Sequence, residues 1–149
     1  MSHISLTYHL VFSTYRRQQT IHVAHERELY KFIHDFSVGR GVKVWRIGGM
    51  PDHVHILCDI PAKYAVADYV KLIKAETSKF LRFNPHFPYW DRWSEGYGAF
   101  SVDVESRACR IRYIMDQKTH HGIVSFRDEY RAMLRERGFG DDVEVLGDR

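Results

Sequence analysis

Residues 42–60 read Val-Lys-Val-Trp-Arg-Ile-Gly-Gly-Met-Pro-Asp-His-Val-His-Ile-Leu-Cys-Asp-Ile. Apolar residues recur at alternate positions in the first part, which is typical of a β-strand over 42–48. The following Gly-Gly-Met-Pro-Asp segment carries the residue types that favour a turn. The run from His53 to Ile60 is apolar enough for a second, buried strand. The whole stretch therefore predicts a β-hairpin.

The rest of the chain places strands and helices around this hairpin in an order that indicates the fold. Apolar residues recur every three or four positions in the predicted helices, and the predicted strands are rich in aromatic and branched side chains. Strands are expected over 6–13 and 100–104, and helices over 25–39, 65–83, 106–118 and 125–137. The order β-α-β-β-α-β is that of the split βαβ, ferredoxin-like fold of the α+β class. We expect a four-stranded antiparallel sheet with helices on one face, plus C-terminal helices, and with the first and third strands as central neighbours.

Length and composition limit the kind of protein this is. The chain has 149 residues, of which 44% are hydrophobic and 28% are charged, which excludes a disordered chain. We expect one domain over residues 1–149, because this length can bury a sufficient core. No apolar run approaches the about 20 residues of a membrane helix, and the N-terminus lacks signal-peptide features. Two cysteines do not make a disulfide framework, so we expect a soluble, cytoplasmic protein with no membrane partner.

Charge is unevenly distributed along the chain. Residues 138–149 carry four acidic residues and one basic residue, whereas the other residues carry 21 basic and 15 acidic ones. A basic body favours a polyanionic partner such as nucleic acid, although many basic domains bind no anion. The sequence offers no role for the acidic tail at about 138–149.

Two residue pairs have a spacing that brings polar groups together. His53 and His55 occupy positions i and i+2 of a predicted strand, so both imidazoles lie on one face and can reach one metal ion. The alternative is two unrelated polar residues at the end of a strand. Tyr113 and Gln117 are at i and i+4 of a predicted helix and share a face. The alternative is that Tyr113 packs in the core and Gln117 faces solvent.

Three segments carry a resemblance to a known family. Gly49-Met50-Pro51-Asp52-His53-Val54-His55 resembles the histidine–hydrophobic–histidine (HUH) motif region of the IS200/IS605-type single-tyrosine (Y1) HUH transposases. Tyr113-Ile114-Met115-Asp116-Gln117, continuing to His120-His121, resembles their tyrosine helix, and residues 93–102 resemble the stretch that precedes that helix. The three segments occur in the family's order over roughly residues 4–135. Members of this family have the ferredoxin-like fold expected above.

The resemblance implies a function and a role for each matching residue. It implies a DNA transposase that nicks and rejoins single-stranded DNA at hairpin-bearing element ends, leaving a 5′-phosphotyrosine link and a free 3′-hydroxyl. Tyr113 is then the nucleophile, and His53, His55 and Gln117 hold a divalent metal ion, Mg²⁺ or Mn²⁺. The resemblance also implies a homodimer in which the tyrosine helix of one subunit can complete the metal site of the other. In a prokaryotic cell such a protein acts at the nucleoid.

The physical chemistry of these residues agrees with that assignment. A phenol has a pKa of about 10 and is a weak nucleophile at neutral pH, so it needs an activated phosphate. A divalent cation on a phosphate oxygen supplies that activation and stabilises the leaving oxygen. Two imidazoles and an amide are neutral ligands, so the cation keeps its full charge.

Further residues are candidates for supporting roles. Asp52 is a candidate to support the metal ligands, and His120 and His121 are candidates either for that role or for DNA contact. Each has an ordinary structural explanation at a turn or a helix end. Trp90 and Trp93 either stack on unpaired bases or, as we favour, fill a core edge. The candidates for contact with DNA, each of which has an ordinary solvated charge as its alternative, are Arg16, Arg17, Lys71, Lys74 and Lys79.

Two other functions compete with the transposase. A ferredoxin-like sheet is also the scaffold of a non-catalytic RNA-recognition module, in which aromatic residues of the central strands stack on bases. The third strand here, beginning at His53, contains no aromatic residue, which counts against that module. A domesticated relative that binds or cuts repeated hairpins without moving an element would have the same site residues.

Overall fold

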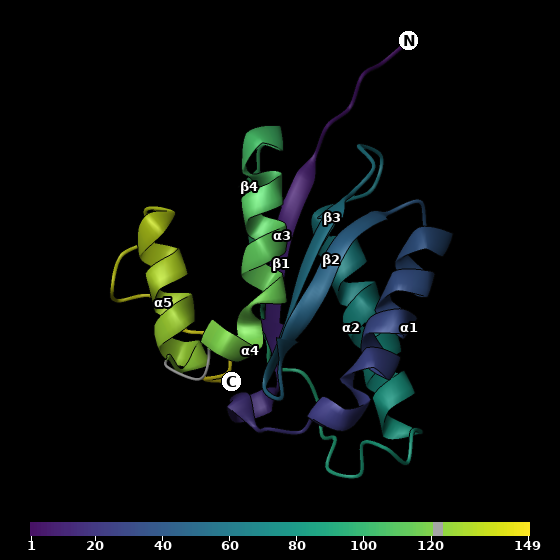
Figure 1. The fold of residues 1–149 in the computed structure, drawn as a ribbon, viewed down its shortest axis with the longest axis vertical. Helices are drawn as coiled ribbons and strands as arrows, with labels where there is room; N and C mark the ends of the chain where they lie inside the picture. Colours follow the sequence, from purple (N-terminus) through teal and green to yellow (C-terminus); the bar gives the residue numbers. More distant parts are fainter. Residues whose placement is uncertain (121–123) are drawn as a thin grey trace.

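The protein folds as a β-sheet between two layers of helices (Figure 1). The computed structural model describes residues 1–120 and 124–149, with the backbone alone at His120. The elements in chain order are β1 (Thr7–Ser13), α1 (Glu26–Gly39), β2 (Lys43–Met50), β3 (His53–Asp59), α2 (Val66–Arg82), β4 (Gly98–Val102), α3 (Arg107–Met115), α4 (Gln117–His120) and α5 (Phe126–Glu136). Short 3₁₀ turns occur at Tyr15–Arg17, Val23–His25 and Val104–Ser106. None of the helices among the described residues is long and apolar enough to cross a membrane.

The sheet has the topology expected from the sequence. Its strand order is β2-β3-β1-β4, and every neighbouring pair is antiparallel. The first and third strands are therefore the central neighbours, as predicted. Their register pairs Ser13 with His53 and Val11 with His55, which places the two histidines on the central pair of strands, where β1 ends and β3 begins.

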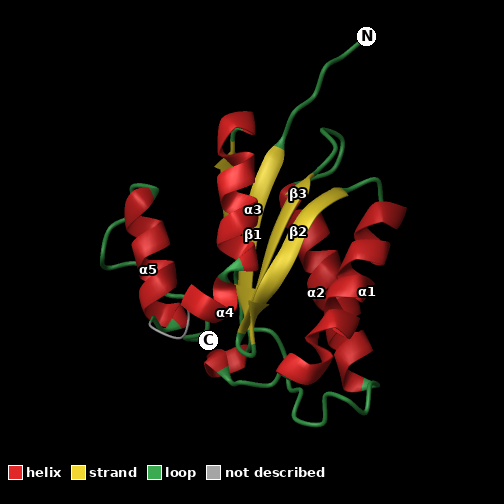
Figure 2. Cartoon of the chain, viewed as in Figure 1, coloured by secondary structure: helices red, strands yellow, loops and turns green. Residues whose placement is uncertain are grey.

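Helices α1 and α2 cover one face of the sheet with an apolar core (Figure 2). Leu10 and Phe12 of β1 and Val54 and Ile56 of β3 point into this layer and are fully buried. The helices contribute fully buried side chains at helical spacing, among them Leu29 and Ile33 of α1 and Tyr69, Val70 and Ile73 of α2. This layer is the main hydrophobic core.

Helices α3, α4 and α5 cover the opposite face. Because side chains alternate along a strand, the odd-numbered residues of β1 and β3 point here. Two small apolar clusters lie on this face, one with Leu57 against Ile114 and one with Val11 against Phe126. Polar side chains occupy the space between those clusters, and His9, His53 and His55 are all fully buried.

Some boundaries differ from the sequence expectation. Strand β4 spans Gly98–Val102 rather than 100–104, because Asp103 leaves the sheet and accepts a hydrogen bond at 3.1 Å from the Ser106 amide. The helix expected over 106–118 is interrupted at Asp116, which separates α3 from α4. The last helix begins as predicted, with the Ser125 hydroxyl accepting from the Asp128 amide at 3.2 Å.

Candidate metal and nucleophile site

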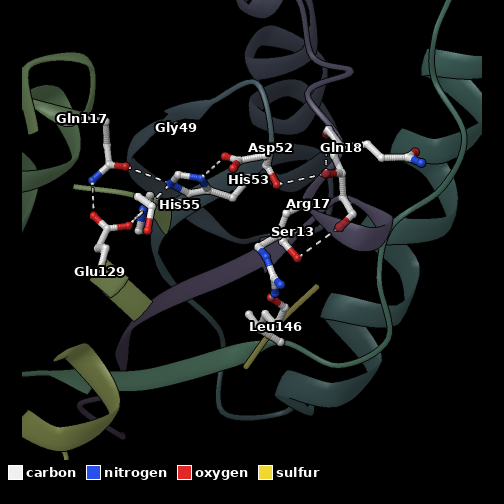
Figure 3. A network of polar contacts seen from close by, with 12 residues as sticks. Ser13, Arg17, Gln18, Gly49, Asp52, His53, His55, Gln117, Glu129 and Leu146 are labelled. Atoms are coloured by element: carbon white, nitrogen blue, oxygen red, sulfur yellow. Dashed lines mark hydrogen bonds and ion pairs between the residues drawn. The ribbon is translucent and has the colours of Figure 1, made fainter. Parts of the chain in front are cut away.

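His53 and His55 lie side by side at the start of β3 (Figure 3). Both side chains are fully buried, and their ring centroids are 4.9 Å apart. The spacing of two residues in a strand produces this arrangement, because both rings leave the same face of the sheet. The structure therefore brings the predicted pair together.

Gln117 and Glu129 meet these histidines from two different helices. The Oε1 atom of Gln117, at the start of α4, is 2.9 Å from Nε2 of His53. The Nε2 atom of Gln117 donates to Oε2 of Glu129 at 2.9 Å, and Glu129 Oε1 is 3.6 Å from His53 Nε2 and 3.5 Å from His55 Nε2. Four side chains from three elements thus converge within the buried face (Figure 3).

Tyr113 lies in the same cluster. Its hydroxyl donates to Oε2 of Glu129, and its ring is edge-on to that of His55, with centroids 5.8 Å apart. Burial, followed by the neighbouring Glu129 carboxylate, raises the pKa of Tyr113. The phenol is therefore protonated at neutral pH and reacts only with an activated electrophile.

Close packing of α3 on the sheet sets the position of Tyr113 and Gln117. A Cβ atom at Gly48 of β2 would lie 2.8 Å from both the Cγ2 and the carbonyl oxygen of Ile114. The absence of a side chain at Gly48 thus lets the helix approach the backbone of β2. Since Ile114 is adjacent to Tyr113, this contact brings the phenol towards the histidines.

Each histidine has a second partner that fixes its orientation. Nδ1 of His53 is 2.7 Å from a carboxylate oxygen of Asp52, so the ring donates its Nδ1–H there. Nδ1 of His55 is 2.8 Å from Nε2 of His9. Burial, followed by the charge of His55, lowers the pKa of His9 well below its usual value, so His9 is neutral. Both site histidines are therefore held with Nε2 directed at the cluster.

The donor set fits a divalent cation. In the neutral tautomer that gives its Nδ1–H to Asp52, His53 directs the lone pair of Nε2 at Gln117 Oε1, which is also an acceptor. Two hydrogen-bond acceptors that are 2.9 Å apart repel each other, and a cation bound by both atoms would stabilise the pair. The cluster offers imidazole nitrogen, amide oxygen and carboxylate oxygen, a mixed set that suits Mn²⁺ and accommodates Mg²⁺.

The basic residues proposed for DNA contact have different surroundings. Arg16 is exposed, whereas Arg17 donates to the Leu146 carbonyl and to the Asp148 carboxylate, both at 2.8 Å. Lys74 donates to the Ser94 and Gly96 carbonyls, and burial lowers the pKa of its ammonium group. Arg17 and Lys74 are thus engaged within the chain.

The remaining predicted residues lie away from the cluster or outside the described residues. Lys71 and Lys79 are exposed on α2, which covers the face of the sheet opposite to the histidines. Trp93 fills a core edge, as favoured above, with its ring edge-on to Phe12 at 4.7 Å. The side chain of His120 and all of His121 lie outside the described residues.

Two residues of the cluster, Glu129 and His9, were not expected from the sequence. Glu129 lies on the apolar face of α5 and is 3% exposed. The signal was available, because this carboxylate interrupts the apolar spacing of Phe126, Tyr130 and Met133. His9 interrupts β1 in the same way, on the face that carries Val11.

Comparisons with known proteins agree with one another. A family model described as "Transposase IS200 like" matches residues 2–117. The ISDra2 transposase TnpA of Deinococcus radiodurans is 28% identical over 119 residues, which is 75% of this chain and 84% of that protein. The transposase for insertion sequence element IS200 of Salmonella typhimurium is 27% identical over 95 residues, or 60% of this chain and 62% of that one.

Two solved structures are similar in fold. A Deinococcus radiodurans crystal structure described as that of a transposase covers 78% of this chain and 95% of its own, with a TM-score of 0.60 and 27% identity. A REP-associated tyrosine transposase bound to a REP hairpin covers all of this chain and 94% of its own, with a TM-score of 0.62. Its sequence identity is 12%, so this second likeness concerns the fold alone.

Proposed function

The chain belongs to the IS200-like transposase family, and from this premise we propose that it nicks and rejoins single-stranded DNA through Tyr113. The observation that carries the proposal is the convergence of a tyrosine hydroxyl with His53, His55 and Gln117 in one buried polar cluster. A nucleophile adjacent to a set of metal-ligating atoms is what a metal-assisted attack on a phosphodiester requires.

In the proposed reaction, the phenolic oxygen of Tyr113 attacks phosphorus. A bond forms between that oxygen and the phosphorus, and the bond from phosphorus to the 3′-oxygen breaks. The departing 3′-oxygen takes up a proton and becomes a free 3′-hydroxyl. The phenolic proton passes along the existing hydrogen bond to Glu129 Oε2. The 5′-phosphotyrosine link conserves the free energy of the broken bond, so rejoining needs no separate energy source.

The residues around the nucleophile have distinct proposed roles. His53, His55 and Gln117 would hold Mg²⁺ or Mn²⁺, which when bound polarises a phosphate oxygen and stabilises the leaving 3′-oxygen. Asp52 and His9 orient the two imidazoles through the hydrogen bonds to their Nδ1 atoms. Because the tyrosine pKa is raised, the phenol keeps its proton until the attack, and the metal site serves to activate the electrophile.

The proposed substrate is single-stranded DNA that carries a hairpin near each end of a mobile element. The basic body of the chain and the neighbour in fold that was solved with a REP hairpin both support it. In this chain Tyr113 and Gln117 lie beside the histidines of the same chain. We propose a homodimer because two copies allow two DNA ends to be handled together.

Replacement of Tyr113 by phenylalanine tests the nucleophile. We expect Tyr113→Phe to abolish the covalent adduct with a labelled single-stranded hairpin DNA in Mn²⁺, while binding of that DNA persists. Tyr89→Phe is the matched control, because the Tyr89 side chain is exposed and not part of the buried cluster. A denaturing gel measures the adduct, and a mobility-shift gel measures binding. An adduct formed by Tyr113→Phe at the wild-type level would overturn the proposal.

A further inference from the structure

The carboxylate of Glu129 reaches the cluster from α5, a helix that lies beyond the residues matched by the family model. We propose that Glu129 is an anionic ligand of the metal ion, through Oε1, in addition to His53, His55 and Gln117. This inference rests on the metal site of the proposed function and adds a fourth, charged ligand to it.

Burial of Glu129 needs a physical reason. The side chain is 3% exposed and projects from the apolar face of α5, between Phe126, Tyr130 and Met133. A carboxylate in such a place is costly unless it is paired or coordinates a metal. Its Oε2 atom accepts hydrogen bonds from Tyr113 and Gln117. A divalent cation held at the cluster would offset the charge of this carboxylate.

The other carboxylate oxygen has the position of a ligand. Oε1 is 3.5 Å from Nε2 of His55 and 3.6 Å from Nε2 of His53. Ligands at about 2.1 Å from one cation lie about 3.0–3.4 Å from one another, so these distances need only a small contraction. Oε1 faces the Nε2 atoms of the two rings, whose orientations are held by the contacts of their Nδ1 atoms with Asp52 and His9.

Helix α5 is held against the site by more than this carboxylate. The Phe126 ring is stacked on that of His53, with centroids 4.0 Å apart and an angle of 18° between the planes. Phe126 and Glu129 are three residues apart and therefore share a face of the helix. A ring contact to one ligand and a carboxylate aimed at two ligands fix this turn of α5 at the cluster.

A fourth, charged ligand changes what the site binds. Two imidazoles and an amide leave the cation at +2, whereas a carboxylate lowers the charge of the site to +1. An oxygen anion favours Mn²⁺ and Mg²⁺, which prefer hard ligands, and the remaining positive charge still attracts a phosphate. Loss of Glu129 therefore weakens cation binding before any DNA is present.

Metal binding by the full chain in the absence of DNA tests the inference. Free Mn²⁺ is counted by electron paramagnetic resonance during titration of the wild type, Glu129→Gln, Glu129→Asp and His53→Ala. Glu136→Gln is the matched control, because Glu136 is exposed at the end of the same helix. We expect Glu129→Gln to weaken Mn²⁺ binding at least about tenfold, because it removes the negative charge of the ligand, and Glu136→Gln to leave it unchanged. Glu129→Asp, which retracts the oxygen, is expected to bind more weakly than the wild type.

The outcomes separate this inference from the proposed function. If His53→Ala loses Mn²⁺ binding while either folded variant of Glu129 binds as tightly as the wild type, Glu129 is not a ligand and the histidine site stands. If His53→Ala also binds as the wild type does, the proposed metal site itself is wrong. Circular dichroism and thermal unfolding establish that each variant is folded, and Glu129→Asp carries the test should the Gln variant not fold.

Discussion

The two faces of the central sheet are built from the same strands and serve different purposes. In β3, Val54 and Ile56 point into the α1–α2 layer and belong to its apolar core. His53 and His55, one position away, point under α3–α5 and are as deeply buried, yet their partners are Asp52, Gln117, Glu129 and His9. The four side chains of β3 are equally buried, but those on one face pack among apolar groups and those on the other contact polar groups.

This difference separates stability from activity within one strand. Apolar burial stabilises the fold in proportion to the area removed from water. Buried polar groups add little net stability even when they are well paired, and they cost free energy when a partner is lost. We therefore expect substitutions on the α1–α2 face to change unfolding, and substitutions on the α3–α5 face to change metal binding and DNA cleavage.

The largest effect is expected on the polar face. His53→Ala should eliminate Mn²⁺-dependent cleavage of single-stranded hairpin DNA, because it removes a proposed ligand and leaves Asp52 without its imidazole donor. A cleavage assay with and without EDTA measures the loss. Full cleavage by His53→Ala in EDTA would mean that the reaction does not use a metal at this cluster.

The counterpart on the apolar face concerns Ile73, a fully buried residue of α2. Ile73→Ala should lower the free energy of unfolding by about 2–5 kcal/mol, since it removes buried methyl groups and leaves a cavity. Urea unfolding measures this change, and Val38→Ala at an exposed position of α1 is the control. Folded Ile73→Ala should bind Mn²⁺ as tightly as the wild type, and a tenfold weaker affinity would show that the two faces are coupled.

A smaller effect is expected from substitution of Asp52, the hydrogen-bond partner of His53. Asp52→Asn removes the charge that fixes the His53 tautomer but keeps the size of the side chain. Partners of this kind are typically worth about 10–100-fold in metal affinity. Isothermal titration with Mn²⁺ compares this variant with Asp91→Asn, which alters an exposed aspartate of the 83–97 loop. An unchanged affinity would assign Asp52 to the turn alone.

The sequence was informative where the information is local. Alternation along 42–60 predicted the hairpin and put His53 and His55 on one face, and the i, i+4 spacing placed Tyr113 and Gln117 together. Glu129 was not found, because its role depends on the docking of α5 against a strand more than 70 residues earlier. The hydrogen bonds of Lys74 could not be predicted either, since they depend on where the chain places the carbonyl groups of Ser94 and Gly96.

The acidic tail, unexplained by the sequence, lies against a residue proposed to contact DNA. Asp148 pairs with Arg17 at 2.8 Å, at partly exposed side chains. In counterion terms, the positive charge of Arg17 is balanced by a carboxylate of its own chain. While Arg17 stays paired with Asp148 it does not neutralise a phosphate, and the salt cation condensed on that phosphate is not released.

Arg17 should therefore contribute little to the salt dependence of DNA binding while Asp148 is present. Each contact with a single strand normally adds about 0.7 to the slope of log affinity against log salt. Asp148→Asn is expected to steepen the slope by up to about 0.7 in filter binding at several salt concentrations, with Asp142→Asn, at an exposed position of the tail, as the control. Equal slopes would mean that Arg17 meets no phosphate. The tail then sets how much of the positive charge of this chain is exchangeable with a nucleic acid, a quantity that the net charge of +3 does not reveal.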